Sequence, residues 1–183
     1  MSKIKVYTIQ NVSVLNKVLK TGEYRTDKRF ICERSFKDAY AWLVKQAKNH
    51  KQSWKEDRPV WVWIKRPDLR QHKYFSDDRK SRVEKKVLIE LEIDEKDILI
   101  SDFDTWHCVL NDCLYFETDQ EWDNFNSKYK KNGKLSKQGR KILEQSWLRC
   151  LNHAQDEYKQ GIIESIRVED IRSVKKFDSI NKK

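Results

Sequence analysis

The spacing of apolar side chains in the first fifty residues predicts one strand and two helices. Charged and apolar positions alternate over residues 3–10, as in a strand with one buried face. Apolar residues then recur every three or four positions over 12–19, and Gly22 follows as a C-terminal helix stop. A second amphipathic helix is predicted over 36–47, with Ser35 as its N-cap.

The middle of the chain predicts strands on either side of a polar loop. Residues 60–64 are β-branched or aromatic and favour a strand, whereas the basic loop predicted at 65–86 is too polar to be ordered by burial. Apolar positions alternate again over 87–93, and 98–100 is another short apolar run. Three strands are therefore expected between residues 60 and 100.

The rest of the chain predicts helices followed by strands. Helical spacing indicates three helices within a segment spanning 104–158, at 106–114, 120–131 and 137–158. The segments 161–168 and 171–177 are rich in β-branched residues and predict closing strands. Because strands and helices do not alternate regularly, we expect one α+β domain spanning residues 1–183.

Composition favours a folded chain that stays in the cytoplasm. A mean hydropathy of -0.92, with no apolar run near ~18 residues, excludes a membrane span. The opening residues lack the apolar segment and cleavage site of a secretory signal, so a cytoplasmic protein is expected. Although 37% of the residues are charged, seven Trp, seven Tyr and seven Phe can supply a core.

Glycine and cysteine usage excludes several classes of site. Four glycines leave no glycine-rich phosphate loop, which excludes P-loop and dinucleotide-fingerprint proteins. The cysteines are expected to be reduced in a cytoplasmic chain; they are Cys32, Cys108, Cys113 and Cys150. Zinc held by two of them with His107 or His153 is disfavoured, because a Cys-x4-Cys pair within one helix faces poorly. No metal is expected.

Charge is distributed unevenly along the chain. Residues 48–86 hold thirteen Lys or Arg and six acidic residues, whereas 87–126 hold one Lys and twelve acidic residues. Basic stretches interleaved with aromatic side chains suit a surface that binds phosphates and stacks bases. The candidate nucleic-acid-binding residues are Trp61, Trp63, Lys65, Arg66 and Arg70. The alternative is that the lysine-rich faces serve only solvation and that both Trp side chains belong to the core.

The densest polar cluster consists of Asp102, Asp104, His107 and Asn111. His107 and Asn111 are four residues apart and therefore lie on one helical face. A histidine flanked by carboxylates could carry the acid–base chemistry of a metal-free ribonuclease. The alternative is that one of the two aspartates caps a helix and that the histidine belongs to a buried hydrogen-bond network.

The first strand carries a resemblance to a known enzyme fold. The sequence Val6-Tyr7-Thr8-Ile9-Gln10, followed by a helix and Gly22, resembles the opening of the ADP-ribosyltransferase fold in DarT-type toxins and the RNA 2'-phosphotransferase group. In that family a Tyr-His-x-Thr-like strand precedes a helix that ends in glycine. Thr8 stands where the family usually has a His or Arg that contacts NAD, between Tyr7 and Gln10 in the strand. The resemblance implies split antiparallel or mixed β-sheets with flanking helices.

The end of the chain is similar to the last strands of the same enzymes. By this resemblance Glu164, in the segment 160–171, is the catalytic glutamate, and Glu169 is its rival. A carboxylate late in a hydrophobic strand is held rigidly while it faces a cleft, and it can stabilise the oxocarbenium-like transition state of nicotinamide release. The resemblance implies NAD as co-substrate.

Further cofactor contacts are expected after the glycine turn, where the resembled fold opens toward its cofactor. Tyr24 is a candidate to stack nicotinamide, and Arg25 or Arg34 to bind the pyrophosphate. A solvated surface arginine is the alternative for either. The whole chain also resembles a bacterial domain family that shares the Tyr-Thr-Ile-Gln start, an Ala-Tyr-x-Trp helix and a Ser-Asp-Phe-Asp-x-Trp-His segment, here at 101–107. This second resemblance implies no activity by itself.

The residues and the resemblance together predict an NAD-dependent ADP-ribosyltransferase that modifies nucleic acid. RNA is preferred over DNA, because single strands expose base edges that a duplex hides. Related enzymes are often toxins, so the resemblance implies a toxin–antitoxin or phage-defence role with a cognate antitoxin as partner. The alternatives are a non-enzymatic nucleic-acid-binding module and the ribonuclease that uses His107.

Overall fold

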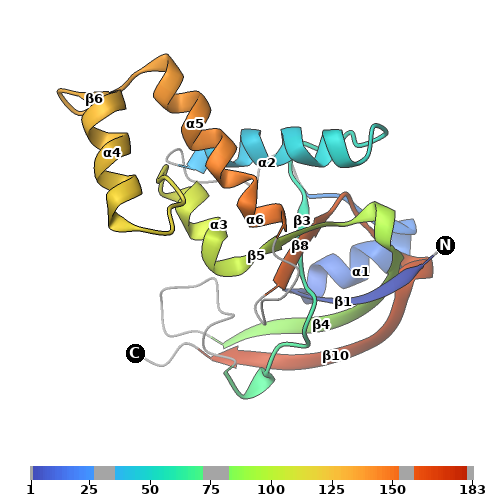
Figure 1. Ribbon diagram of the computed structural model, residues 1–183. Helices are drawn as coiled ribbons and strands as arrows, with labels where there is room; N and C mark the ends of the chain where they lie inside the picture. The colour runs from blue at the N-terminus through green and yellow to red at the C-terminus, as the bar shows by residue number, and fades with distance from the viewer. Residues whose placement is uncertain (1, 27–35, 72–82, 153–158, 181–183) are drawn as a thin grey trace.

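A computed structural model describes residues 2–26, 36–71, 83–152 and 159–180 (Figure 1). The strands are β1 Lys3–Asn11, β2 Glu23–Tyr24, β3 Val60–Trp63, β4 Val83–Asp94, β5 Leu99–Asp102, β6 Lys130–Lys131, β7 Lys134–Leu135, β8 Lys159–Ile163, β9 Ile166–Arg167 and β10 Ile171–Ile180. The helices are α1 Val12–Thr21, α2 Lys37–His50, α3 Phe103–Leu110, α4 Asp119–Tyr129, α5 Lys137–Trp147 and α6 Arg149–Asn152, with short 3-10 helices η3 Glu95–Asp97 and η4 Val168–Asp170. The predicted α+β class is confirmed.

One six-stranded antiparallel sheet organises the chain, in the order β10-β4-β1-β3-β8-β5. The sheet curves around α1, while α2, α3 and α5 lie on its other side (Figure 1). Alternation along the strands produces the two faces, because successive side chains point to opposite sides. Val6, Ile89 and Leu91 face α1 and its buried Leu15 and Val18, in one of two hydrophobic clusters.

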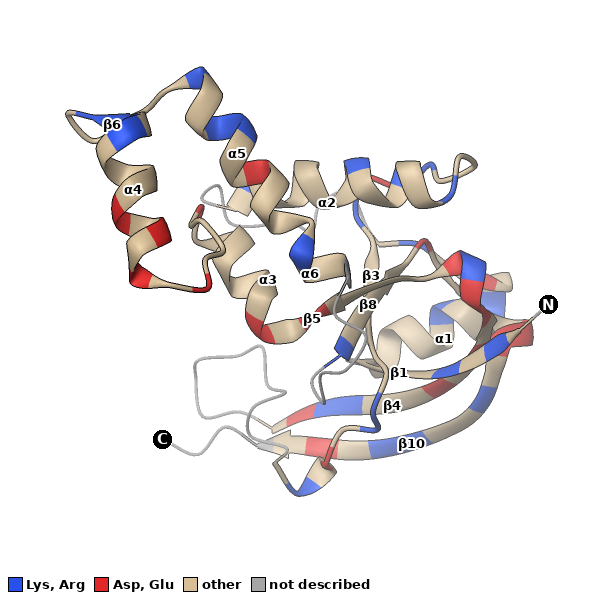
Figure 2. Cartoon of the chain, in the orientation of Figure 1, with Lys and Arg blue, Asp and Glu red and all other residues tan. Residues whose placement is uncertain are grey.

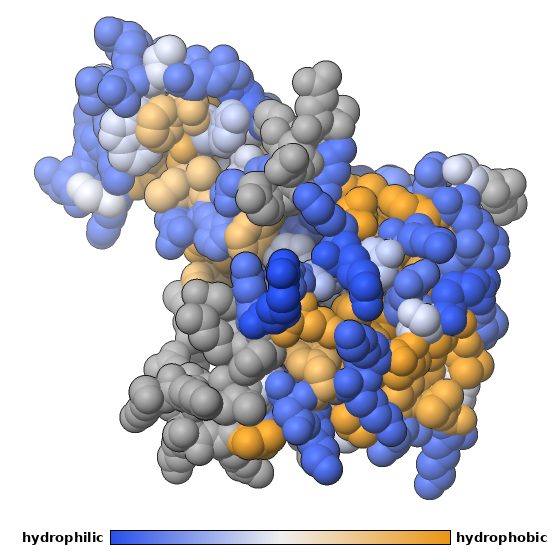
Figure 3. Space-filling view, turned by 90° about the horizontal axis from the view of Figure 1, so that it is seen from below, coloured by the Kyte–Doolittle hydropathy of each residue, from blue (hydrophilic) through white to orange (hydrophobic). Residues whose placement is uncertain are grey.

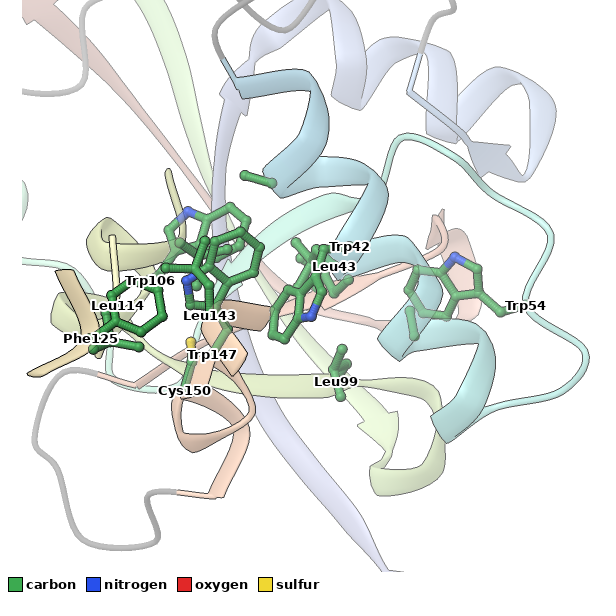
Figure 4. Close-up of a cluster of buried hydrophobic side chains, with 14 residues drawn as sticks. Trp42, Leu43, Trp54, Leu99, Trp106, Leu114, Phe125, Leu143, Trp147 and Cys150 are labelled. Carbon is green, nitrogen blue, oxygen red and sulfur yellow. The ribbon is translucent and has the colours of Figure 1, made fainter. Parts of the chain in front are cut away.

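The second cluster joins the helices to the opposite face of the sheet. Trp42 of α2 and Trp147 of α5 meet edge to face with ring centroids 5.6 Å apart (Figure 4). Leu99 and Ile162 contribute to this cluster from neighbouring strands β5 and β8. Burial of several aromatic rings fixes the helical layer on this part of the sheet, since each ring removes a large apolar area from water.

Strands β1 and β3 pair over only part of their length. β1 pairs with β4 from Lys3 to Asn11, but its register with β3 has the single pair Tyr7 and Trp63. Nearby, the hydroxyl of Thr8 donates to the Trp61 carbonyl at 2.9 Å. A side chain therefore satisfies a carbonyl that would otherwise bond to the backbone of a neighbouring strand, and the two strands diverge there.

Several predicted boundaries are wrong. The strand expected at 87–93 begins at Val83, so the end of the loop predicted at 65–86 belongs to β4. The helix expected at 120–131 ends at Tyr129, because Asn132 and Gly133 both have positive φ and form the tight turn of a β6–β7 hairpin. The expected Ser35 cap lies outside the described residues.

The last predicted helix and strand are each divided. The helix expected at 137–158 ends at Trp147, and α6 follows it, so that the Cys150 thiol lies 3.6 Å from the Asp102 carbonyl. Residues 153–158 lie outside the described part of the chain. The strand expected at 161–168 divides into β8 and β9, which leaves Glu164 between them.

Candidate functional site

The pairing of β2 with β9 brings two distant segments together. Gly22 has a φ of 82°, so the chain turns sharply at the end of α1 into β2. Tyr24 then pairs with Ile166, and the Val168 amide donates to the Gly22 carbonyl at 2.9 Å. The residues after the glycine turn therefore lie beside the segment that contains Glu164.

Glu164 is a partly buried carboxylate with two hydrogen-bond donors. Lys51 Nζ donates to Glu164 Oε2 at 2.8 Å, and the Lys55 amide donates to Oε1 at 2.7 Å. Lys51 Nζ also lies 3.0 Å from Asp97 Oδ1 in η3. The side chain of Glu164 is 14% exposed. One lysine at the end of α2 thus joins two carboxylates from different parts of the sheet.

The contacts of Glu164 keep it ionised. Burial alone would raise the pKa of Glu164, but hydrogen bonds from Lys51 and from the Lys55 amide outweigh burial and lower it. Burial likewise disfavours the charged form of Lys51, yet its bonds to Glu164 and Asp97 raise its pKa overall. The pair therefore carries opposite charges across the neutral pH range.

Arg25 lies beside this pair and is itself held by carboxylates. Its guanidinium bonds twice to Glu23, at 2.9 and 3.0 Å, and once to Glu56 at 2.7 Å. Ser165 donates to Glu23 at 2.6 Å, and this bond is the main reason that the pKa of Glu23 is lowered. We call Glu23, Arg25, Lys51, Asp97 and Glu164 the Glu164 cluster.

The rival glutamate has a different environment. Glu169 is 64% exposed and lies 3.6 Å from Arg167, whose stronger contact is with Asp170 at 2.8 Å. An exposed carboxylate beside one shared arginine is held weakly, because surface ion pairs contribute little. Glu164 is therefore held more firmly than Glu169.

The first-strand candidates lie apart from the Glu164 cluster. Thr8 is buried, and its hydroxyl accepts from Gln10 Nε2 at 2.8 Å while donating to Trp61. Tyr7 is paired with Trp63 and with Glu90 in the middle of the sheet. Of β1, the C-terminal end lies nearest the cluster, because β1 and β8 are both antiparallel to β3 and so finish at the same end of the strands.

Tyr24 and Arg34 are the two remaining candidates for cofactor binding. Tyr24 is half-buried against the α1 side of the sheet, and Lys17 Nζ lies 5.3 Å from its ring centroid. Arg34 falls outside the described residues. Tyr24, Arg25 and Glu164 are therefore the predicted site residues that the fold brings to one region.

The predicted nucleic-acid-binding residues divide into packed rings and exposed cations. Trp61 donates from Nε1 to the Tyr40 hydroxyl at 3.1 Å and packs on Trp106. Trp63 packs on Phe103 with ring centroids 5.3 Å apart. Lys65, Arg66 and Arg70 are exposed, and Arg70 bonds to Asp68 through both carboxylate oxygens.

The polar residues around His107 belong to the N-terminal part of helix α3 and its cap. Asp102 is the N-cap of α3 and accepts from the Thr105 amide at 2.6 Å. Nδ1 of His107 lies 2.9 Å from the Phe103 carbonyl of the same helix, and Asn111 donates to the His107 carbonyl. In the described part of the chain no hydrogen bond or ion pair joins the His107 ring to Asp102 or to the exposed Asp104.

The described residues contain neither a metal-binding cluster nor a membrane-spanning helix. Within the described ranges, no group of three or more His, Cys, Asp or Glu side chains is placed to hold a metal ion. Cys108, Cys113 and Cys150 are free thiols. None of the described helices combines the length and apolarity needed to cross a membrane.

Sequence reasoning missed Lys51 and Asp97. Lys51 was one of thirteen cations in the basic stretch 48–86, and Asp97 was one of twelve acids in 87–126. No local spacing connects either residue to Glu164, so only the tertiary fold could identify them.

Comparisons with known proteins place the chain in a family. No curated protein and no solved structure matches it. A family model matches residues 5–172, which is most of the chain. The chain therefore belongs to the family described as Domain of unknown function (DUF3841).

Proposed function

We propose that the chain is an NAD-dependent ADP-ribosyltransferase that modifies nucleic acid, with RNA as the preferred acceptor and Glu164 as the catalytic carboxylate. The observation that carries the proposal is that the strand containing Tyr24 pairs beside the segment that contains Glu164, and that Arg25 lies close enough to help lower the pKa of Glu164. The β-sheet itself does not carry the proposal, because its main strands form one continuous six-stranded sheet and not the split sheets expected from the resemblance. The proposed setting is a toxin–antitoxin or phage-defence system.

The Glu164 cluster retains unused bonding capacity for a dinucleotide. Arg25 uses three of the five N–H donors of a guanidinium, and its side chain is 44% exposed. Lys51 uses two of its three donors. Arg25 and Lys51 would bind the pyrophosphate, and Tyr24 would pack on the nicotinamide ring. Glu164 accepts two bonds, which leaves lone pairs for ribose hydroxyls.

The chemistry needs an ionised carboxylate held in place. When NAD is bound, the bond between ribose C1 and the nicotinamide nitrogen breaks, nicotinamide leaves as a neutral base, and an acceptor atom bonds to C1 and loses a proton. Glu164 stabilises the positive charge that develops on the ribose. Because the bonds of Glu164 lower its pKa, the carboxylate is in the charged form that this role requires.

The test is transfer of label from NAD to RNA, DNA or lysate protein. Glu164→Gln keeps the shape and one acceptor oxygen, and we expect it to lower the rate by about a hundredfold or more. Glu169→Gln is the matched control and should retain the wild-type rate. Absence of label on every acceptor, or an unchanged rate in Glu164→Gln, overturns the proposal.

A further inference from the structure

The hairpin formed by the end of α4, β6, β7 and the start of α5 is strongly basic. Residues 128–141 hold seven Lys or Arg and no Asp or Glu. Figure 2 shows these cations gathered at the end of the helical layer that projects away from the sheet. The acidic residues of α4 lie at the opposite end of that helix (Figure 2).

Most of these charges are not neutralised within the protein. Arg140 pairs with Asp112 through both carboxylate oxygens. In the described part of the chain, the six lysines of 128–141 make no ion pair with a carboxylate. The hairpin therefore has a positive field that an external anion can satisfy.

Cations and aromatic rings alternate on the same hairpin. Lys128 Nζ lies 5.3 Å from the Tyr129 ring centroid, and Lys130 Nζ lies 5.9 Å from that of Trp122. Outside the hairpin, the Arg149 guanidinium of α6 lies 5.5 Å from the Tyr115 ring centroid and also pairs with Glu117 at 3.0 Å. The three rings are partly buried, and positive charge beside partly exposed aromatic rings is a combination by which proteins hold single-stranded nucleic acid.

A cavity of about 540 Å³ lies between α4 and α5. Its lining includes the rings of Tyr115 and Tyr129, the cations Lys128 and Arg149, one carboxylate, Glu121, and the amide side chain of Asn124. The cavity is open to solvent, so a strand can reach it from outside. In the view from below, the lobe that projects at the upper left has hydrophilic residues around a less polar middle (Figure 3).

We infer that this hairpin binds single-stranded nucleic acid, with phosphates on the lysines of 128–141 and one base in the cavity between α4 and α5. The inference deepens the proposed function, since it names the surface that would hold the acceptor strand. The nucleic-acid contact is thus placed on residues 128–141 and not on the basic stretch 48–86, where the Trp61 ring packs against the hydrophobic core. A single strand is required because a paired base cannot enter a pocket.

Binding of a labelled 12-nucleotide strand to the full chain, without NAD, tests the inference. The variant combines Lys131→Gln, Lys134→Gln, Lys137→Gln and Lys141→Gln. The matched control removes four exposed lysines elsewhere, with Lys3→Gln, Lys20→Gln, Lys175→Gln and Lys176→Gln. We expect the hairpin variant to bind at least tenfold more weakly, and its slope of log K against log salt to fall by about 3. An equal loss in the control, or no loss in the hairpin variant, overturns the inference.

A second variant tests the cavity. Tyr115→Leu keeps an apolar side chain but removes the ring, and we expect about tenfold weaker binding of single strands with little change for heparin. Unchanged binding in Tyr115→Leu overturns the placement of a base. RNA and DNA strands of one sequence are compared, and the tighter of the two identifies the acceptor strand. Because Glu164→Gln should bind normally, failure of the transferase proposal is distinguishable from failure of this one.

Discussion

Lys51 and Glu164 form an ion pair at 2.8 Å across 113 residues of sequence. Lys51 is the C-cap of α2, and Glu164 follows β8, so the pair connects the end of α2 to the end of a strand inside the sheet. Asp97 accepts the same ammonium group at 3.0 Å. The pair therefore has a structural role that any catalytic role must accommodate.

Removal of the lysine should destabilise the fold. Lys51→Met leaves Glu164 and Asp97 without their shared cation, and both are partly buried, so we expect the free energy of unfolding to fall by about 1–3 kcal/mol. Urea unfolding at pH 7 measures this loss. Lys48→Met is the matched control, because its partner Asp57 is 81% exposed, and it should change stability by less than about 0.5 kcal/mol. Equal losses in both variants would contradict the expectation.

The same pair predicts a specific pH dependence. The pKa of Glu164 is lowered in the folded state, so its contribution to stability is complete above its ordinary value of 4.5 and is lost as pH falls through the folded value. The difference in unfolding free energy between wild type and Glu164→Gln should therefore shrink from pH 7 toward pH 3. Urea unfolding at several pH values measures it. A difference that is constant with pH would show that the charge of Glu164 contributes nothing.

Local sequence patterns predicted those helices, strands and turns that are determined by residues close together in the sequence. Gly22 was recognisable as a helix stop because a positive φ is a property of that residue and its turn. The alternation in 87–93 likewise reports a strand, since one face of β4 is buried. The turn at Asn132-Gly133 was equally local, and it falls between the helices predicted at 120–131 and 137–158, but the hairpin that it closes was not predicted. The partners of Glu164 were not predictable, because they are determined by strand order and not by spacing.

Thr8 provides a test of the junction between β1 and β3. Its hydroxyl is buried and bridges the Trp61 carbonyl and the Gln10 amide. Thr8→Val has nearly the same shape but leaves that carbonyl without its donor, so we expect a loss of about 1–3 kcal/mol in unfolding free energy. Thr8→Ser keeps the hydroxyl and should lose less. Thermal and urea unfolding report the difference, and a Thr8→Val protein as stable as wild type would contradict this role.

Gly139 provides a test of the α4–α5 hairpin. A Cβ at this position would lie 2.7 Å from Tyr129 Cβ and 2.8 Å from Leu135 Cδ1. Alanine normally favours a helix over glycine by about 1 kcal/mol, but here overpacking should dominate, and we expect Gly139→Ala to lose about 1–3 kcal/mol. Gln138→Ala, one residue earlier and exposed, is the control and should be neutral or slightly stabilising. If Gly139→Ala is stabilising in urea unfolding, the close packing of the hairpin is refuted.

Variants of Asp102 and His107 distinguish a helix-capping role of this polar cluster from ribonuclease activity. Asp102 is buried and accepts from the Thr105 amide at the start of α3, so Asp102→Ala should lower the free energy of unfolding by about 0.5–2 kcal/mol. Asp102→Asn can still accept this bond and should recover most of the loss. His107→Ala should leave stability nearly unchanged, because the ring is exposed and bonds only to its own helix. Incubation of RNA with wild type and His107→Ala, in the absence of NAD, completes the comparison. RNA shortening by wild type that disappears in His107→Ala would identify a ribonuclease and replace the transferase proposal.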